Sequence, residues 1–179
     1  MPPSRLHPVL RHLFRAPVWL YRLHCGWLLG HRFMLLVHVG RHTGLRRETI
    51  LEVMEYRRDR PEFIVMSAFG RSAGWLRNIE AAPGAAPGAA PGAAPGAGPA
   101  AGPGTAVVVG GRHFVATHRF LGADEAVRVV ADYERRNRLA APVIRVVLSR
   151  LLGWRYDGSD SARRRLVAEL PLIAFRPRP

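Results

Sequence analysis

The sequence predicts a single antiparallel α+β domain. Segments typical of β-strands gather early in the chain, segments typical of helices gather late, and short glycine-containing turns join neighbouring strands. A parallel βαβ fold would instead alternate strands with helices along the chain. The chain has 179 residues, 48% of them hydrophobic, which is enough for one domain with a sizeable core.

The strands are predicted by apolar runs and by alternation. Residues 33–39 form a dense apolar run typical of a buried strand, and residues 47–56 alternate so that Thr49, Leu51 and Val53 share one face. Two consecutive glycines between later short strands indicate a tight hairpin. The expected strands cover residues 33–39, 47–56, 62–67, 106–109, 113–117 and 172–175.

The helices are predicted by the spacing of apolar residues and by signals at their ends. In residues 124–136, acidic residues open the segment and Arg135 and Arg136 close it, which suits the helix dipole. Gly153 and Pro171 each end a later helical segment. The expected helices cover residues 72–80, 124–136, 143–152 and 159–170.

Residues 82–104 contain only alanine, proline and glycine, with a proline at every fourth position from 83 to 103. Such spacing breaks helices and removes the backbone donors that a strand needs. The segment also has no side chain that builds a core. We therefore expect a low-complexity loop inserted within one domain that otherwise spans residues 1–179.

The N-terminal part of the chain is apolar, aromatic and basic. Charged residues such as Arg22 and Arg32 interrupt residues 16–39, whereas a membrane span needs about 20 nearly uncharged residues, and no signal-peptide cleavage pattern is found. The single cysteine, Cys25, excludes an intrachain disulfide and fits a reducing compartment. We therefore expect a cytoplasmic protein whose residues 1–28 pack on the domain, with peripheral membrane contact as the alternative.

The chain carries a strong positive charge. Its 27 basic residues, all of them arginine, outnumber 13 acidic residues, so the formal net charge is +14. This excess is compatible with nucleic acid, an anionic membrane surface or an acidic small ligand as a partner. The aromatic residues fall mostly in apolar runs and are not interleaved with basic residues, so we do not expect binding of nucleic acid.

The turn at residues 40–49 is the most informative feature of the sequence. Its glycines allow several backbone N–H groups to point at one anion, and Arg41, Arg46 and Arg47 add forked donors. Two threonines add hydroxyl groups. The turn predicts a site for a phosphate-bearing ligand, and the alternative is a solvated hairpin tip with ordinary surface arginines.

A second feature follows the third expected strand. The strand ends in Ser67 and Gly70, where the backbone can approach a flat ring, and Trp75 and Asn78 lie one helical turn apart. The alternative is that Trp75 belongs to the core and Asn78 caps a helix. The sequence lacks the common phosphate-loop, dinucleotide, serine-hydrolase and zinc-protease motifs, and its histidines lack nearby Cys or carboxylate clusters, so no metal site is expected.

Taken in order, these features resemble the deazaflavin-dependent nitroreductase family, whose members use coenzyme F420. The family pattern G-R-x-[ST]-G-x-x-R-x-T-x-L is similar to residues 40–51, and its W-x-x-N pattern is similar to residues 75–78. The resemblance covers nearly the whole chain outside residues 82–104. It implies a split β-barrel, a flavin-reductase-like antiparallel barrel with flanking helices.

The resemblance also implies which residues bind the cofactor. The arginine-rich turn would hold the phosphate and glutamate tail, and the second feature would lie at the deazaflavin ring. His42 stands where the family often has a lysine, and a neutral imidazole there would weaken binding of the tail. The implied cofactor-binding residues are Arg41, His42, Thr43, Arg46, Arg47, Thr49, Leu51, Ser67, Ala68, Trp75, Leu76 and Asn78.

The resulting prediction is an F420-dependent reductase. It would transfer a hydride from the reduced deazaflavin to an electron-poor small molecule such as an enone, a quinone or a nitro compound. Tyr133 is the candidate proton donor, and residues 135–150 lack the tyrosine-rich segment of known nitroreductases. A dimer is compatible with the sequence. The alternatives are a flavin- or haem-binding split barrel and a non-catalytic basic protein that binds a membrane surface or nucleic acid.

Overall fold

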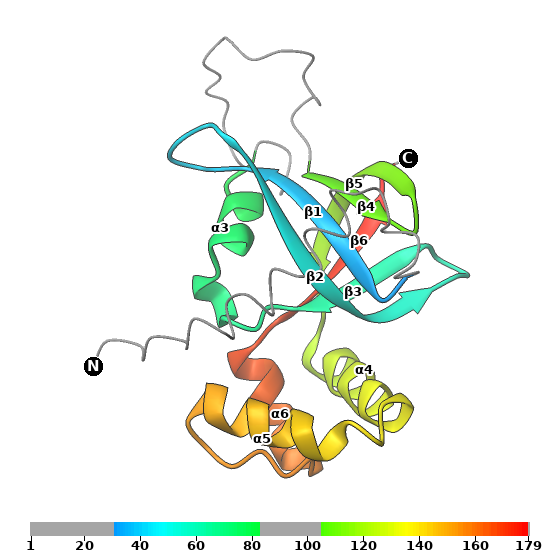
Figure 1. Cartoon of the computed structure of the whole chain (residues 1–179), viewed down its shortest axis with the longest axis vertical. Helices are drawn as coiled ribbons and strands as arrows, with labels where there is room; N and C mark the ends of the chain where they lie inside the picture. Colours follow the sequence, from blue (N-terminus) through cyan, green and yellow to red (C-terminus); the bar gives the residue numbers. More distant parts are fainter. Residues whose placement is uncertain (1–30, 83–104, 179) are drawn as a thin grey trace.

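A closed antiparallel barrel forms the centre of the molecule (Figure 1). The computed structural model describes residues 31–82 and 105–178. The strands lie in the order β1-β2-β3-β6-β5-β4, and the pairing of residues 35–37 of β1 with residues 106–108 of β4 closes the barrel. The expected split β-barrel is confirmed. The strands are β1 (Phe33–Val39), β2 (Arg46–Arg57), β3 (Glu62–Met66), β4 (Thr105–Val109), β5 (Arg112–Phe120) and β6 (Leu172–Pro177).

The described helices lie outside the barrel. In Figure 1, α3 lies against the side of the barrel, and the other three α-helices lie together below it. Residues 1–28, which include Cys25, and the Ala-Pro-Gly segment from residue 83 onward lie outside the described residues. The helices are the 3-10 helix η2 (Gly70–Ser72), α3 (Gly74–Glu80), α4 (Ala123–Arg136), α5 (Ala141–Leu152) and α6 (Asp160–Glu169).

The observed elements match the expected ones, with differences at their ends. β5 continues to Phe120, three residues beyond the prediction, because residues 118–120 pair with β6. The first predicted helix begins at Gly74 instead of residue 72, because η2 precedes it. Ser159 caps α6 and its hydroxyl accepts a hydrogen bond from the Ala162 N–H, as a helix start requires.

Two hydrophobic clusters form the core. Alternate residues of the strands, such as Met34, Leu36 and Leu51, fill the barrel interior together with residues of α3. The second cluster lies on the other face of the barrel wall, where Ile64 of β3 and Ala174 of β6 pack with residues of α4 and α6. The barrel wall is therefore buried on both faces along β3 and β6.

A buried ion network joins the barrel to α4. Glu62 of β3 is 1% exposed and accepts hydrogen bonds from Arg119 at 3.0 Å, Arg176 at 2.5 Å and Arg57 at 3.2 Å. Glu125, in the first turn of α4, accepts from Arg119 at 2.8 Å and from Arg57 at 2.6 Å. A buried carboxylate is tolerated when several donors satisfy it. The network therefore fixes α4 against strands β2, β3, β5 and β6.

The network holds its carboxylates in the charged form. Burial by itself would raise the pKa of Glu62, but hydrogen bonds from Arg119 and Arg176 hold that pKa below its usual value. Hydrogen bonds from Arg119, and then from Arg57, lower the pKa of Glu125 to about 2 against the opposing effect of burial. The native state therefore binds fewer protons in acid than the unfolded chain does.

Acid is expected to weaken the fold through Glu125. Because its pKa is lower in the folded than in the unfolded state, its contribution is complete above the ordinary pKa of 4.5 and is lost as the pH falls toward 2. We expect about 2–3 kcal/mol of this dependence to disappear in Glu125→Gln. Urea unfolding of both proteins between neutral and acidic pH measures it, and equal pH dependence in the two proteins would contradict the role of Glu125.

Candidate functional site

The turn between β1 and β2 is closed by its own backbone. The Gly40 N–H donates to the Leu45 carbonyl at 2.9 Å, and the N–H groups of Thr43 and Gly44 donate to the Gly40 carbonyl at 3.2 and 2.8 Å. The Leu45 N–H lies 3.4 Å from the Thr43 hydroxyl. Most amides of the turn are therefore engaged. This corrects the expectation of several amides pointing at one anion: the turn offers side chains instead.

Gly40 brings two of these side chains together. A Cβ atom at this position would lie 2.7 Å from Thr43 Oγ1 and 2.8 Å from Arg47 Nε, closer than real Cβ atoms approach other atoms. The absence of a side chain thus lets the Thr43 hydroxyl and the Arg47 guanidinium pack over the same backbone atom. Thr43 and Arg47, both predicted cofactor-binding residues, therefore lie beside one another.

Strand alternation separates the neighbouring arginines of β2. Arg47 and Thr49 point to the same face as Leu51 and Val53, which are both 7% exposed and fill the barrel interior. Arg46 points to the opposite face and pairs with Glu48 at 3.3 Å. The structure therefore groups Arg47 with Thr49 and leaves Arg46 apart.

Helix α3 packs its apolar residues into the interior cluster of the barrel. Trp75, Leu76 and Ile79 are buried in the same cluster as the barrel interior, and the Trp75 ring lies 6.4 Å from that of Phe175. Asn78 is also buried, at 7% exposure, and its Oδ1 accepts hydrogen bonds from the Arg41 N–H at 3.2 Å and the Arg41 Nη1 at 3.1 Å. The amide therefore ties the turn to α3 instead of capping the helix.

The same amide contacts a buried histidine. Asn78 Nδ2 lies 3.1 Å from His38 Nδ1, and His38 Nε2 lies 3.2 Å from Thr49 Oγ1. Burial lowers the pKa of His38 and the charge of Arg47 adds to this effect, whereas a backbone hydrogen bond at Val39 opposes it. A histidine with a lowered pKa is neutral at pH 7.

The hydrogen bonds that link Arg41, Asn78, His38 and Thr49 allow only one assignment of donors and acceptors. Arg41 only donates, so Asn78 Oδ1 must accept and Asn78 Nδ2 must donate to His38 Nδ1. The neutral imidazole then carries its hydrogen on Nε2 and donates it to Thr49. Because the Thr49 oxygen accepts here, its own hydrogen is left to donate to a ligand. We call Arg41, Thr43, Arg47 and Thr49 the donor cluster.

The structure shows a role for His38 that the sequence interpretation did not include. Met34, Leu36 and His38 alternate along β1 and all point into the barrel. A polar residue at an interior position of an otherwise apolar strand needs a hydrogen-bond partner. That alternation is the signal in the sequence that identifies His38.

The remaining predicted residues do not join the donor cluster through their side chains. His42 is exposed near the tip of the turn, whereas Leu51, Trp75 and Leu76 are buried in the barrel core. Ala68 is exposed beyond the end of β3.

Ser67 serves a neighbouring turn. Its hydroxyl donates to the Gly70 carbonyl at 2.7 Å, and its N–H donates to the Pro171 carbonyl at 3.0 Å. Gly70 has a φ of +59°, and a Cβ there would lie 2.9 Å from the Glu169 carbonyl oxygen. The Ser67–Gly70 pair therefore holds the end of β3 against the end of α6.

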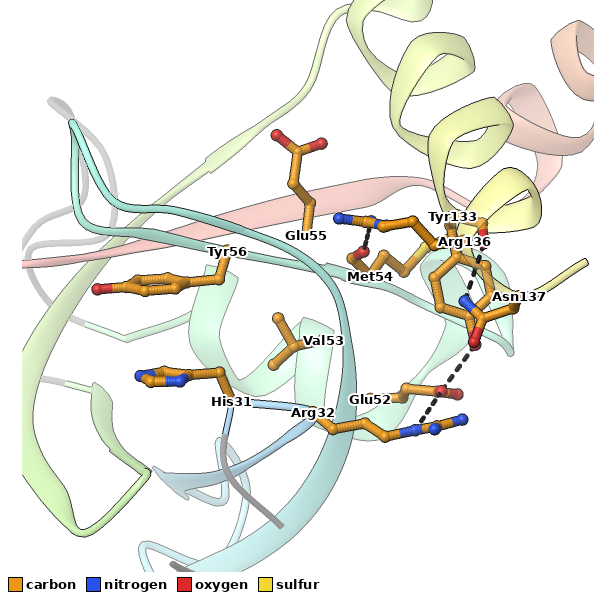
Figure 2. Close-up of a pocket in the computed structure, with 10 residues that line it drawn as sticks. All are labelled: His31, Arg32, Glu52, Val53, Met54, Glu55, Tyr56, Tyr133, Arg136 and Asn137. Carbon is orange, nitrogen blue, oxygen red and sulfur yellow. Dashed lines mark hydrogen bonds and ion pairs between the residues drawn. The ribbon is translucent and has the colours of Figure 1, made fainter.

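Tyr133 lies at a different place, beside an open pocket of about 280 Å³ (Figure 2). Its hydroxyl donates to Glu52 at 2.7 Å, and burial together with this hydrogen bond raises its pKa. Glu52 lies five positions along β2 from Arg47, or about 17 Å. The structure does not bring the candidate proton donor to the donor cluster. The pocket is lined by His31, Arg32, Glu52, Val53, Met54, Glu55, Tyr56, Tyr133, Arg136 and Asn137.

The segment that carries the donor cluster matches a known family. Residues 13–86 match the family model described as F420H(2)-dependent quinone reductase. The match covers less than half of the chain, and it makes this segment similar to that family of F420-dependent oxidoreductases. The family's cofactor is coenzyme F420. The matched segment contains β1, β2, β3 and α3, and with them every predicted cofactor-binding residue. That the protein is a nitroreductase stays a prediction.

Solved structures that match this chain have low identity to it. One is described as the structure of an F420-H2 dependent reductase, FDR-A, with 14% identity, a TM-score of 0.43, and coverage of 83% of this chain and 96% of that one. Another, a protein of unknown function, Atu2129 from Agrobacterium tumefaciens str. C58, has 15% identity, a TM-score of 0.41, and coverage of 99% and 59%. A third, described only as a domain-swapped dimer, has 13% identity, a TM-score of 0.39, and coverage of 90% and 100%. No curated protein sequence matches the chain significantly.

The donor cluster fits the anionic tail of F420. Phosphate and carboxylate groups accept hydrogen bonds, and the four residues of the cluster offer two guanidinium groups and two hydroxyls. In the described ranges 31–82 and 105–178, neither Arg41 nor Arg47 forms an ion pair with a carboxylate, so both keep donors for a ligand. The same ranges hold no group of three side chains suited to a metal ion, and no helix in them is long and apolar enough to cross a membrane.

Removing the Asn78 amide should disturb both the fold and the site. In Asn78→Ala, buried His38 and the Arg41 N–H lose their partner, so we expect the free energy of unfolding to fall by about 1–3 kcal/mol. F420 affinity should fall as well, because Arg41 is no longer held. Denaturant unfolding and a fluorescence titration with F420 measure the two effects.

Asn78→Asp is the matched variant. It keeps an acceptor for Arg41 but replaces the donor to His38 with a carboxylate, which favours the imidazolium form. The pKa of His38 should therefore rise above its wild-type value in an NMR titration. An unchanged pKa would show that Asn78 and His38 are not in contact in solution.

Proposed function

We propose that this protein is an F420H2-dependent reductase whose donor cluster binds the tail of the cofactor. The observation that supports this most strongly is the grouping of Arg41 and Arg47 without carboxylate partners in the described chain, within the segment that matches the F420 family. When bound, the reduced deazaflavin supplies a hydride to an electron-poor acceptor.

Each member of the donor cluster has a distinct part in this proposal. Arg47 and Thr43, side by side over Gly40, would hold the phosphate, since a guanidinium and a hydroxyl together complement its oxygens. Arg41, tied to Asn78, would reach a carboxylate of the tail. Thr49 would donate its free hydrogen, which His38 directs away from the imidazole.

The ring would lie toward the Ser67–Gly70 turn and the start of α3. Ser67, Trp75 and Leu76 have buried side chains there, so they would shape the site without direct side-chain contact. Ala68 and Phe69 are exposed and would face the ring or the acceptor. Because Ala68 carries no polar atom, this end favours an apolar flat partner over a charged one.

Among enone, quinone and nitro acceptors, a quinone is the first to test. The family model that matches this chain is named for quinone reduction. The assay follows the oxidation of F420H2 by its absorbance, with a soluble quinone, a nitroimidazole and an enone as alternative acceptors. Turnover of none of the three with bound cofactor would reject the proposed reaction while leaving cofactor binding intact.

Arg47→Ala should weaken F420 binding much more than Arg46→Ala. Hydrogen bonds to charged groups are worth roughly 1.5–3 kcal/mol, so loss of Arg47 should raise Kd about 10- to 150-fold. Arg46 points to the other face and pairs with Glu48, so its loss should change Kd less than about threefold. Both arginines are exposed, so melting temperatures should stay close to that of the wild type.

Equal effects of the two substitutions would show that the cluster does not hold the tail. Riboflavin 5′-phosphate, which shares the ring type and a phosphate but lacks the glutamate tail, tests the alternative cofactor. Tighter binding of this flavin than of F420 would favour the flavin-binding alternative.

A further inference from the structure

Helix α5 is hydrophobic on two opposite faces. Leu148 and Leu152 pack against the second core cluster. On the other side, Val143, Val146, Val147 and Leu151 are 66%, 53%, 54% and 43% exposed. We call these four residues the outer face of α5. An apolar helix face is normally buried against a partner, so a partner is expected to cover the outer face.

The exposed apolar residues of the described chain concentrate at this place. Nine large hydrophobic side chains are classed as exposed, and five of them lie between Leu139 and Leu151. Leu139, two residues before the start of the helix, is 92% exposed. In Figure 1, α5 lies below the barrel with α4 and α6, on the far side of the molecule from the turn between β1 and β2. The outer face is therefore separate from the donor cluster.

The charges around the outer face are all positive. Residues 138–156 contain four arginines and no acidic residue. Arg138, Arg150 and Arg155 are exposed and form no ion pair with a described residue, and Arg150 lies on the valine side of the helix because it follows Val146 by four positions. The surface combines aliphatic side chains with unpaired cations.

The acidic residues that flank this segment are already engaged. Glu134 is buried and accepts hydrogen bonds from Tyr156 and Arg163, at 2.8 and 2.7 Å. Asp157 accepts from the Ser159 N–H at 2.8 Å. Neither carboxylate forms an ion pair with Arg138 or Arg150 among the described residues, whereas Asp157 interacts with the charge of Arg155.

The charge pattern discriminates between the occupants that could cover this face. If a second copy of the chain docked through the same face, the arginines of one copy would lie against the arginines of the other. The first 47 residues of the chain contain arginine and histidine but no acidic residue, so the N-terminal segment carries the same sign of charge. Like charges at an interface oppose association. A partner that is both apolar and anionic would bury the valines and also pair with the arginines.

We propose that the outer face of α5 docks on an anionic lipid surface. The valines and leucines would enter the boundary between headgroups and acyl chains, and Arg138 and Arg150 would bind the phosphates of the headgroups. With 12 residues the helix is too short to span a bilayer, so it lies in the plane of the interface. The proposal is independent of the cofactor site, and it would bring the protein to the surface where apolar electron acceptors dissolve.

The test uses the full chain with vesicles of phosphatidylcholine alone or mixed with phosphatidylglycerol. Wild-type protein should co-sediment with the anionic vesicles and much less with the neutral ones. Val146→Asp/Val147→Asp should lower the partition coefficient at least about tenfold. Arg138→Gln/Arg150→Gln should lower it about 30-fold on anionic vesicles, since each of the two cations near such a surface contributes about 1 kcal/mol and about 1.4 kcal/mol corresponds to tenfold. Val115→Asp and Arg58→Gln/Arg60→Gln, exposed elsewhere, are the matched controls.

Three results would overturn the proposal. Unchanged vesicle binding in both α5 variants would assign any lipid contact to another part of the chain. A large fall in melting temperature in the valine variant would show that a segment of the same chain covers the face, because aspartate and valine have similar helix propensities. Dissociation of a wild-type dimer in the valine variant, seen by light scattering, would assign the face to a second copy.

Discussion

Closure of the barrel is the constraint on which the rest of the structure depends. Once β1 pairs with β4, every strand has an inside and an outside, and each residue is assigned to one of them by its position in the alternation. The apolar residues of β1 and β2 fill the interior, and His38 and Thr49 continue the same inward rows. Arg46 and Arg47 are adjacent in the sequence, but closure separates them into a surface ion pair and a member of the donor cluster.

Polar residues of β1, β2, α3 and the turn between β1 and β2 form a chain of hydrogen bonds that positions two members of the donor cluster, Arg41 and Thr49. Asn78 comes from a helix and His38 from a strand, yet their side chains meet and hold Arg41 and Thr49 on either side. Burial keeps the histidine neutral, and neutrality is what allows it to accept on one nitrogen and donate on the other. These hydrogen bonds hold the Arg41 and Thr49 donors in place before any ligand binds, which is what electrostatic preorganisation requires.

Positive charge has different roles in different parts of this arginine-rich molecule. Around Glu62 and Glu125, arginines are satisfied by carboxylates and join the barrel to α4. In the donor cluster and beside the outer face of α5, arginines lack carboxylate partners in the described chain, and these are the two places where an anionic ligand is proposed. The net charge of +14 is thus less informative than the distribution of unpaired cations.

The sequence by itself determined the kinds of elements, their order and the segment in which the cofactor site is proposed. Alternation located β1 and β2, the glycine turn located the arginines, and the spacing of Trp75 and Asn78 indicated their shared helix, because these signals are local. Only the tertiary structure decided which residues meet. It placed Asn78 against Arg41 and His38. It also placed Tyr133 of α4 beside Glu52 of β2, away from the donor cluster, and buried Leu51, Trp75 and Leu76. Those outcomes depend on strand register and on where α3 packs, which are contacts between residues far apart in the chain.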